Sequence, residues 1–149
     1  MPSDVPCKPD GYQTVIPYLH VNGAAKLIAF MKDVFDAQEI AVYPRPDGTV
    51  GHAALRIGDS VVELADVSAE WPAMPCALQV YVPDTDDAYH RALKAGASSL
   101  LPPATQFYGD RTASVRDSSG NNWYIATQIE VVSREEVEKR LAAMGQSKK

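Results

Sequence analysis

The pattern of expected strands and helices occurs twice along the chain, and this duplication limits the possible folds more than any other feature. In each half, an apolar strand pattern leads into a helix and then into three further strands. Val21 and Val82 end the first strands of the two halves, 61 positions apart. The same offset carries Glu63, in the fourth strand, onto Tyr124 in the last one. A single offset that serves both ends of the unit predicts two tandem βαβββ modules.

Local signals define the elements of the first module. TVIPYLHV at 14–21 is expected to be a strand, and Pro17 favours an edge or bulged position for it. Asn22 is expected to cap the following helix, whose apolar residues recur at helical spacing. A strand at 38–44 comes next, and then two runs that flank Gly58-Asp59. Two turn residues between such runs predict a tight hairpin.

The second module has comparable signals. Asp84 or Thr85 is expected to cap its helix, and Gly96 to end it. The next segment, SSLLPPATQFYG, is expected to be broken by its prolines, ahead of the two strands RTASVR and NWYIATQI. Ser133 and Glu136 form a capping box that opens a C-terminal helix. This order of elements matches that of the first half.

The expected fold class is α+β. A four-stranded unit is too small to bury its apolar face alone, so the two units are expected to form one domain. We expect two tandem βαβββ modules that form a curved, half-open barrel sheet, followed by the C-terminal helix. That helix carries an apolar stripe of Val137, Leu141 and Met144. The predicted organisation is a flexible segment at 1–13, a paired-module domain at 14–130 with modules 14–67 and 77–130, and a C-terminal helix and tail at 131–149.

Composition excludes several classes of partner. The 14 basic and 19 acidic residues give a net charge of −5, which disfavours binding to nucleic acid. No run approaches the roughly 20 apolar residues of a membrane span, and the Pro-rich start has no apolar core of a signal peptide. Cys7 and Cys76 have no metal or redox spacing. We expect a cytoplasmic protein that binds neither nucleic acid nor a membrane.

Four segments resemble the vicinal oxygen chelate superfamily, the group of glyoxalases, bleomycin-resistance proteins and extradiol dioxygenases. They are VIPYLHVNGAAKLIAFMKDVFDAQ, HAALRIGDSVVEL, VYVPDTDDAYHRALKAGA and YGDRTASVRDSSGNNWYIATQ. The last is similar to the superfamily's Y-G-x-R…D-P-x-G-x-x-W ending, and most closely to that of its PhnB-like branch. The resemblance covers about residues 14–130. It implies paired βαβββ modules around a concave site, a homodimer and, in many members, a divalent metal.

The metal ligands of the superfamily lie on the first and fourth strands of each module. The matching positions in this sequence are Ile16, Glu63, Ala77 and Tyr124. Of these, only Glu63 suits a hard divalent ion, and one carboxylate does not form a ligand set. We therefore expect no metal at these positions and no cofactor. Two interpretations of the remaining polar residues stay open. His20, His52 and Glu63 form a rebuilt metal site, or His52 only hydrogen-bonds Glu63 or a ligand.

Strand alternation predicts which side chains share the concave face. The predicted ligand-binding residues are Tyr18, His20, His52, Glu63, Gln79, Tyr81, Thr112, Ser114 and Tyr124. The opposite face is expected to form the core, with Trp123 in it. Arg111, in the YGDR motif, is expected either in the mouth of the cleft or in an ion pair with Asp110 or Asp117. His90 is expected at the surface.

Three functions stay open. The first is a metal-free protein of the bleomycin-resistance type, which binds a small molecule in the concave cleft. The second is a superfamily lyase, isomerase or dioxygenase with a rebuilt or metal-free acid–base site that uses Glu63 and His52. The third is a scaffold whose cleft is vestigial or serves a protein partner. No nucleophile motif, phosphate loop or dinucleotide fingerprint is present.

Overall fold

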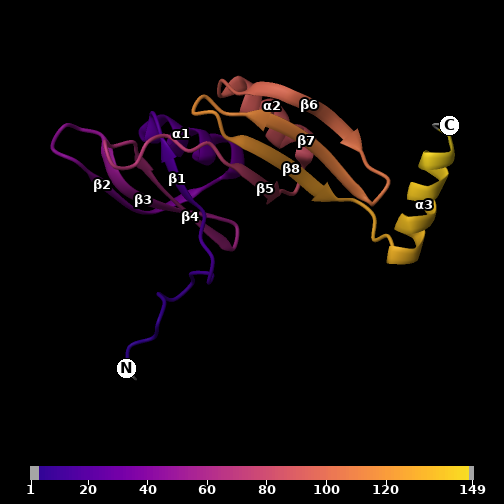
Figure 1. Cartoon of the computed structure of the whole chain (residues 1–149), viewed down its shortest axis with the longest axis horizontal. Coiled ribbons are helices and arrows are strands. Elements are labelled where there is room, and N and C mark those ends of the chain that lie inside the picture. Colours follow the sequence, from indigo (N-terminus) through magenta and orange to yellow (C-terminus); the bar gives the residue numbers. More distant parts are fainter. Residues whose placement is uncertain (1–3, 148–149) are drawn as a thin grey trace. The chain divides into compact units, whose positions relative to one another are not determined.

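The computed structural model describes residues 4–147, and the chain divides into two compact units, Met1–Cys76 and Ala77–Lys149. Each unit contains one strand–helix–strand–strand–strand series, which can be followed along the colours of Figure 1. The predicted α+β fold is confirmed: two four-stranded mixed sheets with one helix each, neither closed into a barrel, and a C-terminal helix. Among residues 4–147, no helix is long and apolar enough to cross a membrane.

The first unit contains a sheet with the strand order β1-β4-β3-β2. Its only parallel pair is β1 with β4, while β4, β3 and β2 pair antiparallel. Helix α1 packs on β3 and β4. The element bounds are β1 Tyr18–Val21, α1 Ala24–Phe35, β2 Gln38–Pro44, β3 Val50–Ile57 and β4 Ser60–Asp66.

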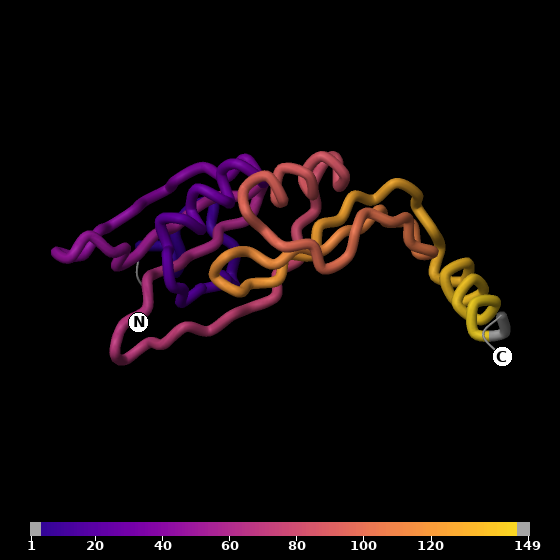
Figure 2. Tube along the Cα trace, turned by 90° about the horizontal axis from the view of Figure 1, so that it is seen from above, coloured from indigo at the N-terminus to yellow at the C-terminus, as the bar shows by residue number. Residues whose placement is uncertain are grey.

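The second unit repeats this arrangement, with the strand order β5-β8-β7-β6 and a parallel pair of β5 and β8. Helix α2 packs on β6, β7 and β8. The bounds are β5 Ala77–Tyr81, α2 Thr85–Lys94, β6 Ser98–Thr105, β7 Asp110–Arg116, β8 Asn122–Gln128 and α3 Arg134–Ser147. In Figure 2 the trace of this unit runs from pink, at the residues of β5, through orange to yellow, at those of α3.

Strand register confirms the duplication inferred from the sequence. Tyr18 lies opposite Glu63 in the first unit, and Gln79 lies opposite Tyr124 in the second. Both residues of the second pair are 61 positions beyond those of the first. The antiparallel hairpins differ slightly: Ala54 pairs with Glu63, but Ser114 pairs with Tyr124, an offset of 60 for that strand. The first and last strands of the two modules therefore align at one offset, and the strand before the last hairpin differs from it by one residue.

Proline explains two differences between the expected and observed strands. The strand expected at 14–21 begins only at Tyr18, after Pro17, which contributes its carbonyl oxygen to a 2.9 Å bond from the Glu63 N–H. The segment expected to be broken by prolines is instead a strand, β6, which contains Pro102 and Pro103. Because β6 is an edge strand, its missing N–H groups interrupt the register without breaking the sheet.

The two sheet helices are capped in different ways. The predicted cap by Asn22 is wrong: the N-cap position of α1 is Gly23, and the carboxylate of Asp66 accepts the N–H groups of Gly23 (3.0 Å) and Ala24 (2.9 Å). In α2 the Asp84 side chain accepts the N–H of Asp87 at 3.1 Å, as predicted. A long-range carboxylate therefore stabilises one helix start and a local carboxylate the other.

The core of each unit lies between its sheet and its helix. In the first unit it includes Leu19, Leu55 and Leu64, which have no exposed surface. In the second unit the indole of Trp123 is fully buried, and its Nε1–H donates to the Asp117 carboxylate at 2.8 Å. This confirms the expectation that Trp123 is a core residue rather than a ligand platform. The alternate residues of the same strands are left on the open face of each sheet.

Helix α3 begins with the predicted cap, since the Ser133 Oγ accepts the Glu136 N–H at 3.1 Å. Arg140 ties the helix to its own unit by bonds to the Phe107 carbonyl oxygen (2.9 Å) and the Glu130 carboxylate (3.0 Å). These bonds lower the pKa of Glu130. The apolar stripe expected on this helix is only partly covered, because Leu141 and Met144 are exposed.

Candidate functional site

The open face of the first sheet brings three predicted residues into one hydrogen-bonded row. The hydroxyl of Tyr18 lies 3.1 Å from Nδ1 of His52, and Nε2 of His52 lies 3.2 Å from the Glu63 carboxylate. One neutral tautomer satisfies both contacts, with Nε2–H donating to Glu63 and Nδ1 accepting from Tyr18. The sequence-based alternative in which His52 bonds Glu63 is therefore present in the structure.

The electrostatics of this row keep Tyr18 protonated. Burial raises the pKa of the Tyr18 hydroxyl, the negative charge of Glu63 raises it further, and the positive charge of Arg45 opposes the rise. Tyr18 is therefore a hydrogen-bond donor at neutral pH.

The ring of His52 also lies parallel to that of Tyr43, with centroids 6.2 Å apart and an interplanar angle of 18°.

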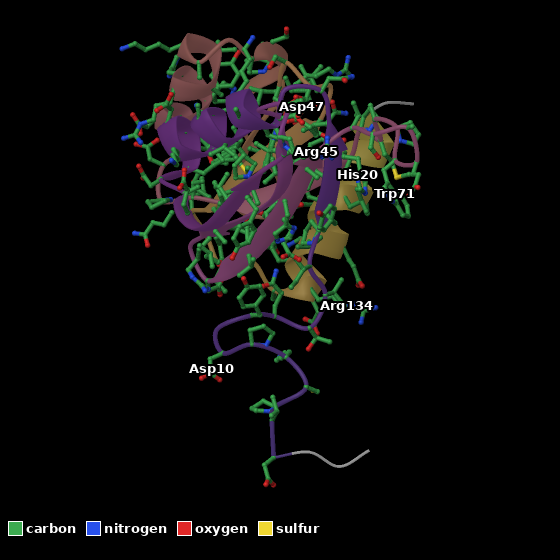
Figure 3. All side chains as sticks on the ribbon, turned by 90° about the vertical axis from the view of Figure 1, so that its left-hand side faces the viewer. Asp10, His20, Arg45, Asp47, Trp71 and Arg134 are labelled. Carbon is green, nitrogen blue, oxygen red and sulfur yellow. The ribbon has the colours of Figure 1, made fainter. Side chains whose placement is uncertain are left out.

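A pocket of about 410 Å³ adjoins this row. Its walls combine aromatic rings with polar groups, and its lining residues are Tyr18, His20, Arg45, Gly51, Ala65, Asp66, Ser68 and Trp71. The ring of Trp71 stacks on that of His20 at 5.4 Å and 10°, and Tyr18 lies 5.1 Å from His20. Figure 3 shows His20, Arg45 and Trp71 on the same side of the first unit. We refer to this cavity as the Trp71 pocket.

Of the eight lining residues, sequence analysis predicted only Tyr18 and His20, and three of the six that it missed lie outside the strands, namely Arg45, Ser68 and Trp71. Arg45 lies in the turn after β2, and the other two lie in the segment after β4, which Figure 2 shows as a long loop of the first unit. Strand alternation says nothing about loop side chains, so these residues gave no periodic signal. The one signal in the sequence was a tryptophan in the segment between the two expected modules, and in the structure Trp71 has 59% of its surface exposed.

Arg45 is held firmly at the wall of the Trp71 pocket. Its guanidinium donates to the backbone oxygens of Val67 (3.0 Å) and Asp66 (2.8 Å) and to the Thr49 hydroxyl (3.3 Å). All three acceptors are neutral oxygens. The side chain therefore has a fixed position, and its positive charge is not neutralised by any ion pair found among residues 4–147.

The predicted residues of the second unit form a separate group on its sheet. Gln79 and Tyr124 lie opposite each other on β5 and β8, both exposed. Tyr81 donates its hydroxyl to the Asp110 carboxylate at 3.0 Å, and this bond is the main cause that raises the pKa of Tyr81. Tyr81 is thus oriented by a buried acid on β7, which is separated from β5 by β8.

The other two predicted residues of this unit lie on β7. Ser114 is buried and pairs with Tyr124, and the hydroxyl of Thr112 accepts a 3.0 Å bond from the Gln106 amide. The nine predicted ligand-binding residues therefore fall into a group of four on the first unit and a group of five on the second.

Arg111 takes a different partner from those expected. It forms a bidentate ion pair with Asp86 in the first turn of α2, with N–O distances of 3.0 and 3.1 Å. The predicted pairing with Asp110 or Asp117 is wrong, because those two carboxylates accept the Tyr81 hydroxyl and the Trp123 indole. The hydrogen bonds to Asp86 raise the pKa of Arg111. This pair fastens β7 to α2, while His90 is exposed as expected.

The residues present do not fit the metal centre that many members of the superfamily hold. Ile16 and Ala77 have aliphatic side chains, and the Glu63 carboxylate is bonded to His52. In the part of the chain that the structure describes, no three His, Cys, Asp or Glu side chains are grouped to hold a metal ion. His20, His52 and Glu63 are accordingly not brought together as a ligand set.

Comparison with known proteins places the chain in a family. Residues 14–125 match the sequence model of the Glyoxalase/Bleomycin resistance protein/Dioxygenase superfamily, and the chain belongs to it. A protein of Mycobacterium bovis, described as uncharacterised, is 32% identical over 140 residues, which cover 87% of this chain and 92% of that protein. A Mycobacterium tuberculosis protein with the same description is also 32% identical, over 87% of this chain and 82% of its own length.

Solved structures support the fold. TioX of Micromonospora sp. ML1 has a TM-score of 0.66 at 24% identity, covering 78% of this chain and 99% of that one. The fosfomycin resistance protein FosX of Listeria monocytogenes has a TM-score of 0.58 at 16% identity, covering 84% of this chain and 97% of that one. At these identities the likeness concerns the fold alone.

Proposed function

We propose that this protein binds a small, flat organic molecule on the open face of its first sheet, without the metal centre found elsewhere in the superfamily. The observation that carries the proposal is the Trp71 pocket beside the Tyr18–His52–Glu63 row. Its volume of about 410 Å³ is in the range of small-ligand sites. Tyr18 belongs to both the pocket and the row, so a ligand in the pocket is within reach of a polarised hydroxyl group.

The polar groups of the row have an organising role in this proposal. Glu63 fixes the tautomer and orientation of His52, and His52 in turn orients the Tyr18 hydroxyl. A side chain held by such a chain of bonds loses little conformational freedom when a ligand arrives, which favours binding. The superfamily description, which includes bleomycin resistance, and the fosfomycin resistance protein of similar fold are consistent with a ligand-binding role.

A ligand screen by thermal shift tests the proposal. Glu63→Gln is expected to weaken the binding of a hit by about 1.5–3 kcal/mol, because it removes the charged partner of His52. Glu135→Gln, the same change in the first turn of α3, is the matched control and should leave binding unchanged. Tyr124→Ala separately tests whether the open face of the second unit binds a hit of its own. If every hit binds all variants equally, the scaffold function replaces this one.

The absence of the superfamily's metal centre is part of the proposal and has its own test. It is supported by the aliphatic residues at positions 16 and 77. Elemental analysis after purification without chelators is expected to find no stoichiometric divalent metal. A content of about one metal per chain that disappears in Glu63→Ala would contradict the expectation.

We also propose that the protein is a homodimer of the PhnB-like branch. The Tyr108–Arg111 motif, followed by Asp117, Gly120 and Trp123, supports the branch. Exposed apolar residues on α3, Leu141 and Met144, support an oligomer. Light scattering at micromolar concentration is expected to give twice the chain mass of 16.2 kDa. A mass of one chain would contradict the dimer.

A second candidate function is metal-free acid–base catalysis in the same place. The specific observation in its favour is the 3.2 Å contact between His52 and Glu63, which is the arrangement of an oriented general base. Catalysis is distinguished from binding by the fate of the ligand. Conversion of a bound compound that is lost in His52→Gln, with binding retained, would favour the enzyme.

A further inference from the structure

The charges around the Trp71 pocket contain information about the ligand it accepts. The pocket has one fixed cation at its wall, Arg45, whose three hydrogen bonds all go to neutral oxygens. A half-buried guanidinium without an ion-pair partner attracts an anion more strongly than a fully solvated one. The carboxylate of Asp47 in the same turn bonds the Thr49 hydroxyl that Arg45 also bonds, and its pKa is lowered mainly by the bonds from Thr49 and further by the positive charge of Arg45.

The two acids near the pocket are already bound to donors. Asp66 lines the pocket, but its carboxylate accepts the backbone N–H groups of Gly23, Ala24 and Val50 at 2.8–3.0 Å. Glu63 does not line the pocket, and its carboxylate bonds His52. Asp66 keeps its negative charge, but both of its oxygens already accept backbone N–H groups, and Glu63 lies outside the pocket lining, so neither carboxylate is free to bond a cationic ligand there.

His20 contributes a buried ring nitrogen that lacks a hydrogen-bond partner within the described residues. This atom is Nδ1, and the His20 ring lies between those of Tyr18 and Trp71. An enclosed ring nitrogen without a partner is unfavourable. A ligand oxygen would remove this cost by accepting a hydrogen bond from the Nδ1–H tautomer of His20. Because Nδ1 is enclosed, the imidazole must turn or the Trp71 ring must shift for this contact to form.

The walls of the Trp71 pocket are partly aromatic. Tyr18, His20 and Trp71 present flat rings, and Trp71 is largely exposed although it belongs to the pocket wall. Exposed indole surface at a pocket favours a flat partner that can lie against it. We propose that the Trp71 pocket selects planar aromatic oxyanions, such as aromatic carboxylates, with the carboxylate toward Arg45 and the ring against Trp71. This inference rests on the proposed function and names the class of its ligand.

Three probes of equal shape and different charge test the selection: benzoate, benzamide and benzamidine. Binding is followed in ¹⁵N-labelled protein through the two indole N–H signals. Trp71 reports on the pocket, and the buried Trp123, bonded to Asp117, is the internal reference. Trp71→Phe assigns the two signals. Benzoate is expected to shift the Trp71 signal alone, with an affinity about tenfold or more above those of benzamide and benzamidine.

Variants identify the source of the selection. Arg45→Gln is expected to remove the preference for benzoate. Arg134→Gln, the same change at a highly exposed arginine of α3, is expected to leave it intact. Since Arg45 also bonds the Asp66 and Val67 backbone, Arg45→Lys is the second variant: it keeps the charge, so benzoate should still bind better than benzamide.

The outcomes separate this inference from the function on which it rests. Equal or tighter binding of benzamidine, or a benzoate preference that survives Arg45→Gln, overturns the inference. If none of the three probes shifts Trp71 but a screened compound binds in a Glu63-dependent manner, the inference is wrong and the proposed function stands. If no compound of any charge binds in that manner, the proposed function itself is wrong.

Discussion

Trp123→Ala is expected to lower the free energy of unfolding by about 3–5 kcal/mol. The indole is fully buried between β8 and the rest of the second unit, so its removal leaves a cavity. The Asp117 carboxylate also loses the donor at 2.8 Å, although the backbone N–H groups of Ser119 and Asn121 still bond it.

Denaturant unfolding followed by circular dichroism measures this effect. The matched control is Trp71→Ala, because that indole is 59% exposed. Its expected change is within about 1 kcal/mol. Trp123→Phe removes the indole N–H but leaves a smaller cavity than Trp123→Ala, so its loss should be smaller. Similar losses for Trp123→Ala and Trp71→Ala would contradict the assignment of Trp123 to the core.

Asp66→Ala is expected to lower the free energy of unfolding by about 3–5 kcal/mol, since three backbone N–H groups lose their acceptor together. Two of these groups begin α1, and the third belongs to Val50 at the start of β3. The carboxylate therefore joins the helix to two strands of its sheet. Its negative charge also stabilises the start of the helix.

The control for Asp66 is Asp47→Ala in the exposed turn after β2. Asp47 accepts the two bonds from Thr49 in an exposed turn, and its loss is expected to cost about 1 kcal/mol or less. Asp66→Asn retains one acceptor oxygen and should fall between the two. The same denaturant measurement applies. An effect of Asp66→Ala no larger than that of Asp47→Ala would contradict the role of Asp66 as a long-range cap.

Features set by neighbouring residues were predictable from the sequence. The alternation of Tyr18, Leu19 and His20 gave the open and buried faces of β1, because successive strand residues point to opposite sides. The hairpin at Gly58-Asp59 and the cap at Asp84 depend on two to four consecutive residues. The repeated offset also predicted that Glu63 and Tyr124 occupy corresponding positions in the two modules, which the strand register confirms.

Features set by distant residues could not be predicted in this way. The cap of α1 comes from Asp66 rather than Asn22, and the partner of Arg111 is Asp86 rather than an acid on its own hairpin. Both depend on which elements pack together. The pocket residues Arg45 and Trp71 lie in loops, whose paths are determined by the finished sheet. The prolines of β6 misled because sequence alone does not show that a strand lies at a sheet edge.

The different caps of the two sheet helices have a consequence for the order of folding. The acceptor for the start of α2 lies three residues from its donor, so that turn can form as soon as its own segment exists. The acceptor for Ala24 at the start of α1 lies 42 residues away, and closing that loop requires β4 to be in place. During synthesis α1 is made long before Asp66 emerges. The start of α1 therefore gains its hydrogen-bond acceptor only after β4 has been made, whereas the start of α2 has its acceptor from the beginning.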